Sequence, residues 1–327
     1  MTALLSVRNL GVSMRTRQGP LHITERISFD LAPGERVGLV GESGCGKSVT
    51  GLALMGLLRR RTSTVSGEIL LEGRDMNAMR EAERRRLRGA SIAMVFQEPM
   101  SALDPVFTIG EQIGESLRSH FRTPRREARE RAIDMLARVG IPDPARRCDE
   151  YPHQLSGGMR QRAMIAIALA CEPKVLVADE PTTALDVTIQ AQVIDLLLRM
   201  SEDLGTAMIF ITHDIGVVAE TCQRVLTMYL GQIVEDAPTD TVLARPRHPY
   251  TSGLMRSLPR LGAWKEPLPS IPGRVPSLAA VPAGCRFAPR CTYARAECGA
   301  AQPMQEGPWG QARCWQAGAL QLKGTLA

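Results

Sequence analysis

The sequence of 327 residues has few aromatic residues, 4% of the chain, and it contains no long uninterrupted apolar run. A helix that spans a bilayer needs about 20 apolar residues, whereas the apolar runs here are short, such as Met164 to Ala170. The opening stretch MTALLSVRNL is interrupted by Arg8, so we expect no signal peptide. These absences predict a chain without a membrane span and with a cytoplasmic location.

The scarcity of aromatic residues also bears on the positive charge. The formal net charge is +6, with arginine concentrated at 83–88 and 122–131. Platforms for base stacking are few, so we expect no nucleic-acid partner. Mixed Arg/Glu helices with solvated faces would account for the charge. Contact with anionic lipid head groups, or with a membrane partner near them, is a second explanation that the sequence does not separate from the first.

The first motif in the sequence is a glycine-rich loop, which lies between an apolar stretch and a segment with the apolar pattern of a helix. Glu35 to Val40 is typical of a short buried strand, and the ten residues VTGLALMGLL that start at Val49 are typical of a helix. A strand, G-x-x-x-x-G-K-S and a helix in this order predict a phosphate-binding loop rather than a chance turn. Lys47 would contact the β- and γ-phosphates and Ser48 would bind Mg²⁺, while the Cys45 thiol has no expected role. The predicted nucleotide-binding residues are Gly41, Glu42, Ser43, Gly44, Cys45, Gly46, Lys47, Ser48 and Val49.

Two further apolar stretches end in residues that suit phosphate chemistry. KVLVADEP, Lys174 to Pro181, ends in Asp179, which could hold Mg²⁺, and in Glu180, which could orient or deprotonate an attacking water. TAMIFITHD, Thr206 to Asp214, is typical of a third strand, and that strand ends in His213. Ligands bind at the carboxyl ends of parallel strands, so His213 is a candidate contact for a γ-phosphate.

A second glycine pair lies more than a hundred residues after the phosphate loop. In HQLSGGMRQR, Ser156, Gly157 and Gly158 come just before a helical pattern. The exposed N–H groups of a helix start can bind an anion. The chain therefore carries two candidate phosphate sites, and an ordinary helix cap is the alternative for the second.

Taken together, these residues resemble the ATP-binding-cassette family over about residues 5 to 250. The resemblance adds Gln97 in VFQEP at the position that contacts Mg²⁺ and the water, the signature LSGGM that ends at Met159, and Asp186 in TALD. It implies that two cassettes pair head to tail, so that Ser156, Gly157, Gly158 and Met159 contact the partner's ATP. Glu180, His213 and Gln97 would be catalytic, and Ser48, Gln97 and Asp179 would bind magnesium.

The resemblance also implies the architecture. We expect an α/β phosphate-loop NTPase core with an antiparallel β subdomain and a helical subdomain, followed by a loop-rich extension that contains cysteines. The ATPase domain would cover 1–255, with the helical subdomain at about 100–166, and the extension would cover 256–327. The family's aromatic adenine platform is replaced here by Met14, whose sulfur can pack on a ring.

Longer segments resemble the D-type ATPases of bacterial dipeptide/oligopeptide permeases, among them RHPYTSGLMRSLP and GCRFAPRCTYARAEC. This implies a second, F-type ATPase, two membrane permease subunits and an extracytoplasmic binding protein. The chain would lie peripherally at the cytoplasmic face of the bacterial inner membrane. Nickel, opines or glutathione-like peptides are alternative cargoes. A non-transport iron–sulfur ATPase and the cassette proteins of DNA repair or translation are alternative functions that fit the motifs less well.

Four cysteines gather near the end of the chain, with the spacing C-x5-C-x6-C-x15-C. A metal site is favoured over disulfides in a reducing cytosol, but the spacing matches neither common zinc knuckles nor common ferredoxins. The residues alone leave a cluster, zinc or free thiols open. The permease resemblance implies a [4Fe–4S] cluster, with zinc as the alternative, on Cys285, Cys291, Cys298 and Cys314.

Overall fold

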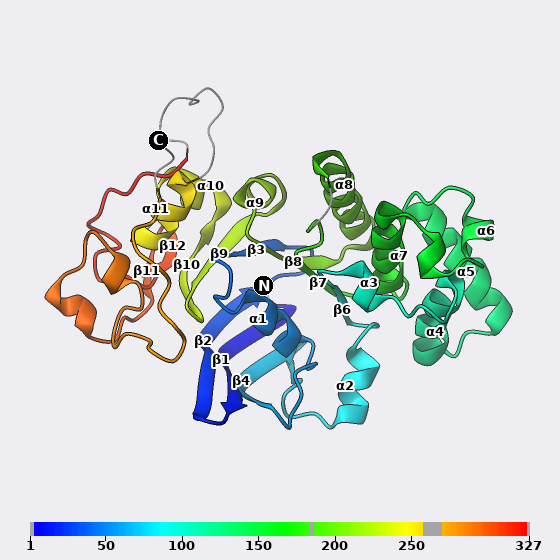
Figure 1. Ribbon diagram of the computed structural model, residues 1–327, viewed down its shortest axis with the longest axis horizontal. Coiled ribbons are helices and arrows are strands. Elements are labelled where there is room, and N and C mark those ends of the chain that lie inside the picture. Colours follow the sequence, from blue (N-terminus) through cyan, green and yellow to red (C-terminus); the bar gives the residue numbers. More distant parts are fainter. Residues whose placement is uncertain (1–2, 184–185, 258–269, 326–327) are drawn as a thin grey trace. The chain divides into compact units, whose positions relative to one another are not determined.

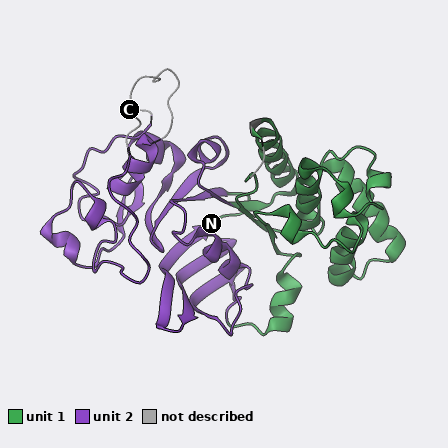
Figure 2. Cartoon of the chain, viewed as in Figure 1, with its two compact units in different colours: residues 1–2, 32–35, 78–209 green, residues 3–31, 36–77, 210–327 purple. Residues whose placement is uncertain are grey.

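The structure, a computed structural model, describes residues 3–183, 186–257 and 270–325. The chain forms two compact units (Figure 2). The first unit contains residues 1–2, 32–35 and 78–209, and the second contains 3–31, 36–77 and 210–327. The chain passes between the two units several times, for the last time within strand β8 (Ala207–Thr212).

The first unit contains two parallel strands, β6 (Ile92–Val95) and β7 (Val175–Asp179), paired from Ile92↔Val175 to Val95↔Ala178. Every residue of both strands is buried. Continuous apolar runs of this kind are typical of parallel strands that are covered on both faces. The strand expected within Lys174 to Pro181 is thus confirmed, and Asp179 is its last residue.

Helices make up most of the rest of the first unit, drawn in teal and green in Figure 1. In α4, the buried residues Ile109, Ile113 and Leu117 recur every four positions, and Thr108 and Glu111 form a capping box at its start. The helical part expected from the sequence is therefore present. The helices are α2 (Glu81–Leu87), α3 (Pro99–Ala102), α4 (Ile109–Phe121), α5 (Arg125–Arg138), α6 (Pro144–Arg147), the 3₁₀ helix η1 (Pro152–Gln154), α7 (Gly157–Leu169) and α8 (Val187–Leu204).

An antiparallel sheet in the order β2-β1-β4-β5 forms one part of the second unit (Figure 1). Leu5, Val7, Leu10 and Val12 of β1 are all buried although they do not follow one alternation, because the pairing of β1 shifts between Val7 and Leu10. The antiparallel β subdomain expected from the sequence is confirmed. Its strands are β1 (Leu5–Thr16), β2 (Gly19–Leu31), β4 (Ser63–Leu71) and β5 (Arg74–Asp75).

The second unit also holds strands that pair an early part of the chain with its C-terminal region. Strand β3 pairs in parallel with β9, β9 pairs antiparallel with β10, and β10 pairs with β12 of the C-terminal region. The elements are β3 (Arg36–Val40), α1 (Lys47–Leu54), α9 (Ile215–Thr221), β9 (Arg224–Tyr229), β10 (Gln232–Pro238), α10 (Thr239–Ala244), α11 (Pro249–Arg256), the 3₁₀ helices η2 (Ala288–Arg290) and η3 (Ala296–Gly299), β11 (Gln305–Gly307) and β12 (Gly310–Ala312).

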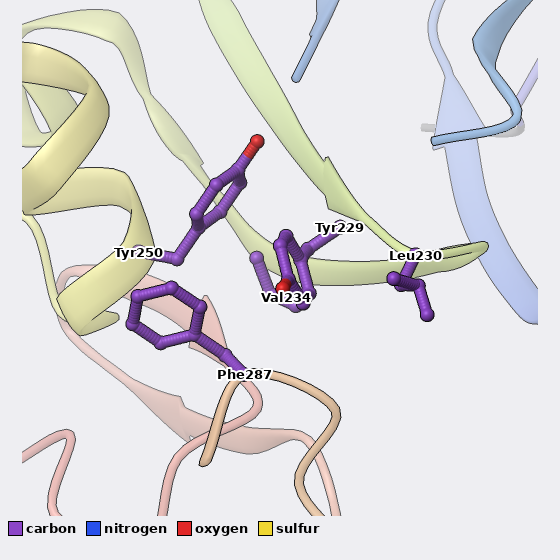
Figure 3. Close-up of a cluster of buried hydrophobic side chains, with 5 residues drawn as sticks. All are labelled: Tyr229, Leu230, Val234, Tyr250 and Phe287. Atoms are coloured by element: carbon purple, nitrogen blue, oxygen red, sulfur yellow. The ribbon is translucent and has the colours of Figure 1, made fainter. Parts of the chain in front are cut away.

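A buried aromatic cluster anchors the C-terminal region to this unit (Figure 3). Phe287 lies against Tyr229 of β9 and Tyr250 of α11, with ring centroids 5.3 Å and 5.4 Å away. Leu230 and Val234 complete the cluster. The extension, which is poor in helix and strand, thus shares a core with β9, β10 and α11. Among the helices of the described residues, none combines the length and the apolar character that a bilayer crossing requires.

Candidate functional site

The glycine-rich loop lies between β3 and α1, and close backbone packing explains two of its glycines. A methyl group added at Gly41 would lie 2.1 Å from the Met228 carbonyl oxygen. Gly46, the N-cap of α1, has φ 105°, and a methyl group there would lie 2.9 Å from the Thr24 side chain. Only glycine fits both positions without strain. The loop is therefore shaped by its own unit.

Lys47 begins α1, and its side chain is buried inside the curve of the loop. Its ammonium donates to the carbonyl oxygens of Gly41 at 2.8 Å and Glu42 at 3.3 Å. This places a positive charge at the start of a helix, where the backbone N–H groups of the loop also favour anions. Burial raises the pKa of the neighbouring Cys45 thiol, with the Lys47 charge acting in the opposite direction. A protonated, buried thiol is inert, in agreement with the absence of an expected role.

Three further contacts hold the loop from outside, and two of them come from segments near the C-terminus. The Glu42 backbone N–H donates to the Tyr250 hydroxyl at 2.8 Å. Arg290 donates to both carboxylate oxygens of Glu42, at 2.8 Å and 3.1 Å. The Gly231 N–H donates to the Cys45 carbonyl at 2.8 Å. Sequence reasoning missed Tyr250 and Arg290, because no spacing pattern links residues more than 200 positions apart.

The remaining candidates of the second unit lie on exposed or half-buried surface. His213 directly follows β8 and is exposed, and Asp214 caps the next helix by accepting from Gly216 and Val217. Ser48 and Val49, in the first turn of α1, are half-buried. Met14 lies in β1 opposite Leu21 of β2 and Ser63 of β4, also half-buried.

In the first unit, the structure brings Gln97 and Glu180 together. Gln97 donates to Glu180 Oε2 at 3.1 Å, and the Thr183 hydroxyl donates to the same oxygen at 2.9 Å. Glu180 follows the buried Asp179 and has φ 44°, a left-handed conformation that is rare for a residue with a Cβ. Such conformations persist where surrounding contacts hold them, often at functional sites. Thr183 was expected only as part of TALD, and its contact with Glu180 was not anticipated.

The second glycine pair lies at the start of α7, also in the first unit. Ser156 caps the helix by accepting from the Met159 N–H at 3.4 Å. A methyl group at Gly157 would meet nothing within 4 Å, and one at Gly158 would meet only an Ile189 methyl group at 3.6 Å. These glycines are therefore not required by their own chain.

The TALD segment follows Glu180 and leads into α8. Asp186 caps this helix, accepting from the Ile189 N–H at 3.0 Å. Two members of the segment, Ala184 and Leu185, lie outside the described residues. Asp186 itself is exposed.

The four C-terminal cysteines lie in one neighbourhood, but the described residues give no support for the metal site expected there. The Cys285 N–H donates to the Cys298 carbonyl at 2.9 Å, and both Cys285 and Cys291 pack on the aromatic cluster. Within the described part of the chain, no group of three or more His, Cys, Asp or Glu side chains could hold a metal ion. The [4Fe–4S] cluster and the zinc alternative on Cys285, Cys291, Cys298 and Cys314 are therefore not supported.

The four thiols differ in their exposure: Cys298 and Cys314 are buried, and Cys285 and Cys291 are half-buried. Burial raises the pKa of Cys285 and of Cys314, and it raises the pKa of Cys291 to about 11. The neighbouring cysteines of this group raise the pKa of Cys291 and of Cys314 further, so these thiols lie near one another in space as well as in sequence.

Comparisons with known proteins identify the family of this chain. Residues 24–183 match the family described as ABC transporter, and residues 234–298 match the oligopeptide/dipeptide transporter C-terminal region. A putative peptide import ATP-binding protein of Brucella melitensis is 53% identical over 312 residues, which cover 92% of this chain and 92% of the relative. One from Brucella abortus is 51% identical over 312 residues, 95% of this chain and 94% of the relative.

Solved structures agree with these relatives. A dimeric ATP-binding cassette in a post-hydrolysis state, bound to ADP and Pi, has a TM-score of 0.65 and 27% identity, covering 72% of this chain and 98% of that one. The cbiO1 protein of Clostridium perfringens, part of an ABC transporter complex, has a TM-score of 0.62 and 30% identity, covering 74% of this chain and 91% of that one. With the phosphate loop, the acidic strand end and the signature turn all in place, the chain belongs to the ATP-hydrolysing subunits of the ABC transporter family.

Proposed function

We propose that this chain is an ATPase subunit of a bacterial importer for dipeptides or oligopeptides. ABC ATPases use ATP and Mg²⁺, and the matched C-terminal region and the peptide-import relatives support a peptide cargo. The domains would be an ATPase domain at 1–255, with its helical subdomain at about 100–166, and an extension at 256–327. The matched C-terminal region begins at residue 234, inside the proposed first domain.

The phosphate loop would bind this chain's own ATP. Lys47 supplies the charge, and the loop N–H groups surround the phosphates. Met14 would pack against the adenine. Ser48, Asp179 and the Gln97 amide oxygen would hold Mg²⁺, which prefers oxygen ligands. Gln97 directs its amide nitrogen to Glu180, so its oxygen is the atom left for a cation.

Glu180 would act on the attacking water, and His213 would contact the γ-phosphate. The Gln97 and Thr183 donors converge on Glu180 Oε2. They hold that oxygen, and with it the whole carboxylate, in one orientation. A general base needs a fixed position within hydrogen-bond reach of the proton that it removes. Asp186, beside this segment, would contact the partner ATPase.

The observation that supports pairing with a second ATPase is the open space beside Gly157 and Gly158. Glycine at the first positions of a helix costs conformational entropy without a packing reason here. An anion that approaches the N–H groups from outside the chain would supply that reason. Ser156, Gly157, Gly158 and Met159 would therefore contact ATP held by a second, F-type ATPase in a head-to-tail dimer.

The assembly would include two membrane permease subunits and, indirectly, an extracytoplasmic binding protein. The chain would lie peripherally at the cytoplasmic face of the inner membrane. Co-purification of the tagged chain from its native host, followed by identification of its partners, tests this assembly. Recovery of two permeases and a second ATPase is expected, together with ATP-dependent uptake of a dipeptide or oligopeptide by the reconstituted complex. Recovery of the chain with none of these partners would contradict the proposal.

Gly158→Asp tests the pairing itself. A carboxylate at this position would repel the partner's γ-phosphate, so hydrolysis by the complex should fall while ATP still binds this chain's own loop. The measurement compares ATPase rate and nucleotide binding in the complex. An isolated subunit that hydrolysed ATP at the full rate of the complex would show that pairing is not required.

A further inference from the structure

The segment between Cys285 and Cys291 reaches the phosphate loop through one side chain, Arg290. We propose that Arg290, with Tyr250, is a positioning residue for ATP, so that the C-terminal extension holds the phosphate loop in its nucleotide-binding shape through Glu42. The inference rests on the proposed assignment of residues 41–48 as the ATP-binding loop, and the experiment below separates the two.

Several contacts fix the Arg290 side chain against Glu42, and we call this Arg290–Glu42 pair the clamp. Its side chain is 5% exposed and donates to both Glu42 oxygens. Its Nε donates to the Pro272 carbonyl at 2.9 Å, and its guanidinium carbon lies 5.8 Å from the centroid of the Tyr229 ring. A bidentate pair fixes both distance and orientation. Arg290 is therefore held by the extension on one side and holds Glu42 on the other.

Glu42 connects Arg290 to the groups of the loop that would bind phosphate. Its carbonyl oxygen accepts from Lys47, and its N–H donates to Tyr250. Tyr250 belongs to the buried cluster that also contains Phe287 of the extension (Figure 3). The second residue of the loop is thus fixed at its N–H, its carbonyl and its carboxylate. A loop that is already in its binding shape pays less conformational entropy when the ligand arrives.

Charge gives the clamp a second effect. Glu42 places a carboxylate within the loop that would hold a triphosphate, and Arg290 neutralises it. Arg290 is buried and Glu42 is half-buried. Removing one partner of such a pair leaves an uncompensated charge that water screens only in part, whereas removing both is less costly. An unpaired Glu42 would repel the phosphates. Loss of Glu42 should therefore restore part of what the loss of Arg290 removes.

The test uses the full chain in its complex with the partner subunits and measures the KM for ATP, kcat and thermal stability. Arg290→Met should raise the KM about tenfold, with kcat changed less than about threefold, because a lost charge-assisted pair weakens binding on this scale. Glu42→Gln combined with Arg290→Met should bring the KM back toward the wild-type value. Arg290→Lys keeps the charge without the two-pronged geometry and should give an intermediate KM.

Arg313→Met is the matched control. Arg313 also belongs to the extension, is half-buried, and donates to the carbonyl oxygens of Ile233 at 3.0 Å and Gln302 at 2.9 Å rather than to the loop. Arg313→Met should lower the melting temperature as Arg290→Met does and leave the KM unchanged. Equal KM values for the Arg290→Met and Arg313→Met proteins, or a double variant no better than Arg290→Met, would overturn the inference. If Arg290→Met does not assemble, Arg290→Lys and Glu42→Gln give the same comparison.

Lys47→Ala distinguishes the two levels of the proposal. If it fails to weaken ATP binding, the assignment of the loop is wrong and the clamp has no nucleotide to position. If it weakens binding but the Arg290 variants do not, only the role of the extension is wrong.

Discussion

Two turns of this chain place glycine at the start of a helix, yet the reasons for the glycines differ. At the phosphate loop, Gly41 and Gly46 are required by close contacts with Met228 and Thr24 of the same unit. At the signature turn, Gly157 meets nothing and Gly158 meets one methyl group. A glycine that its own chain requires points to a preformed site. A glycine that its own chain does not require points to a molecule from outside.

The difference extends to the surroundings of the two turns. The phosphate loop is held by Lys47, Tyr250, Gly231 and Arg290. The signature turn is held mainly by the Ser156 cap. The first turn should therefore act within the subunit and the second only within an assembly, and four sets of substitutions test or sharpen this contrast.

Lys47→Ala should have the largest effect. It removes the buried cation of the phosphate loop, so tight ATP binding and turnover should both be lost, by about 10³-fold or more in rate, since positioning and charge stabilisation supply most of phosphoryl-transfer catalysis. ATPase assays and nucleotide binding on the complex check this. Undiminished hydrolysis would show that ATP binds elsewhere.

Glu180→Gln should separate binding from chemistry. Gln keeps the shape and the hydrogen bonds but removes the base and one negative charge, so the rate should fall by about 10²–10⁴-fold. ATP affinity should persist or rise. Asp179→Asn, the matched control, should weaken Mg²⁺ and nucleotide binding as well. The measurements are the ATPase rate and the nucleotide retained in the purified complex. Near-normal turnover of the Glu180→Gln complex would show that another residue activates the attacking water.

Gly41→Ala and Gly157→Ala test the contrast directly. The first puts a methyl group against a backbone oxygen and should destabilise the subunit by roughly 1–3 kcal/mol, as overpacked or strained positions do. The second should leave the melting temperature of the isolated subunit unchanged, or raise it slightly, and should reduce hydrolysis only in the complex. Equal melting temperatures for the two variants would remove the distinction between the turns.

Ser156→Ala should have the smallest effect. It removes one helix cap, which is worth about 1 kcal/mol, so the melting temperature of the isolated subunit should fall by only a few degrees. Ser156→Asp keeps a capping oxygen and is the control for stability, but it adds a negative charge beside the proposed phosphate. Recovery of stability without recovery of ATPase activity in the complex would separate the two roles of this residue.

The local elements of the fold could be predicted well. Short apolar runs with glycine or acidic ends predict the strands that end at Val40 and Asp179. The same kind of pattern predicts the helix that follows the glycine-rich loop. These patterns act over a few residues, and the backbone has few alternatives there. The helix after the glycine-rich loop was predicted over 49–58, whereas α1 begins two residues earlier, at Lys47, and ends four residues earlier, at Leu54.

The cysteine site is a prediction that the structure does not support. The spacing suggested four thiolates and the permease resemblance implied a [4Fe–4S] cluster, but no group in the described residues could hold a metal ion. Ligation depends on side-chain directions within about an ångström, which loop-rich backbone does not encode in its spacing. The left-handed conformation of Glu180 and its Thr183 contact were likewise beyond sequence reasoning.

By itself, the sequence determined which chemistry this protein performs, because the phosphate loop, the acidic strand end and the signature turn are contiguous motifs whose residue types specify their ligands. Only the tertiary structure decided which residues support them. Arg290 and Tyr250 meet Glu42 across more than 200 residues of chain, since a buried aromatic cluster brings the extension and α11 to the loop. Contacts at that separation depend on how the core packs, and no local pattern records them.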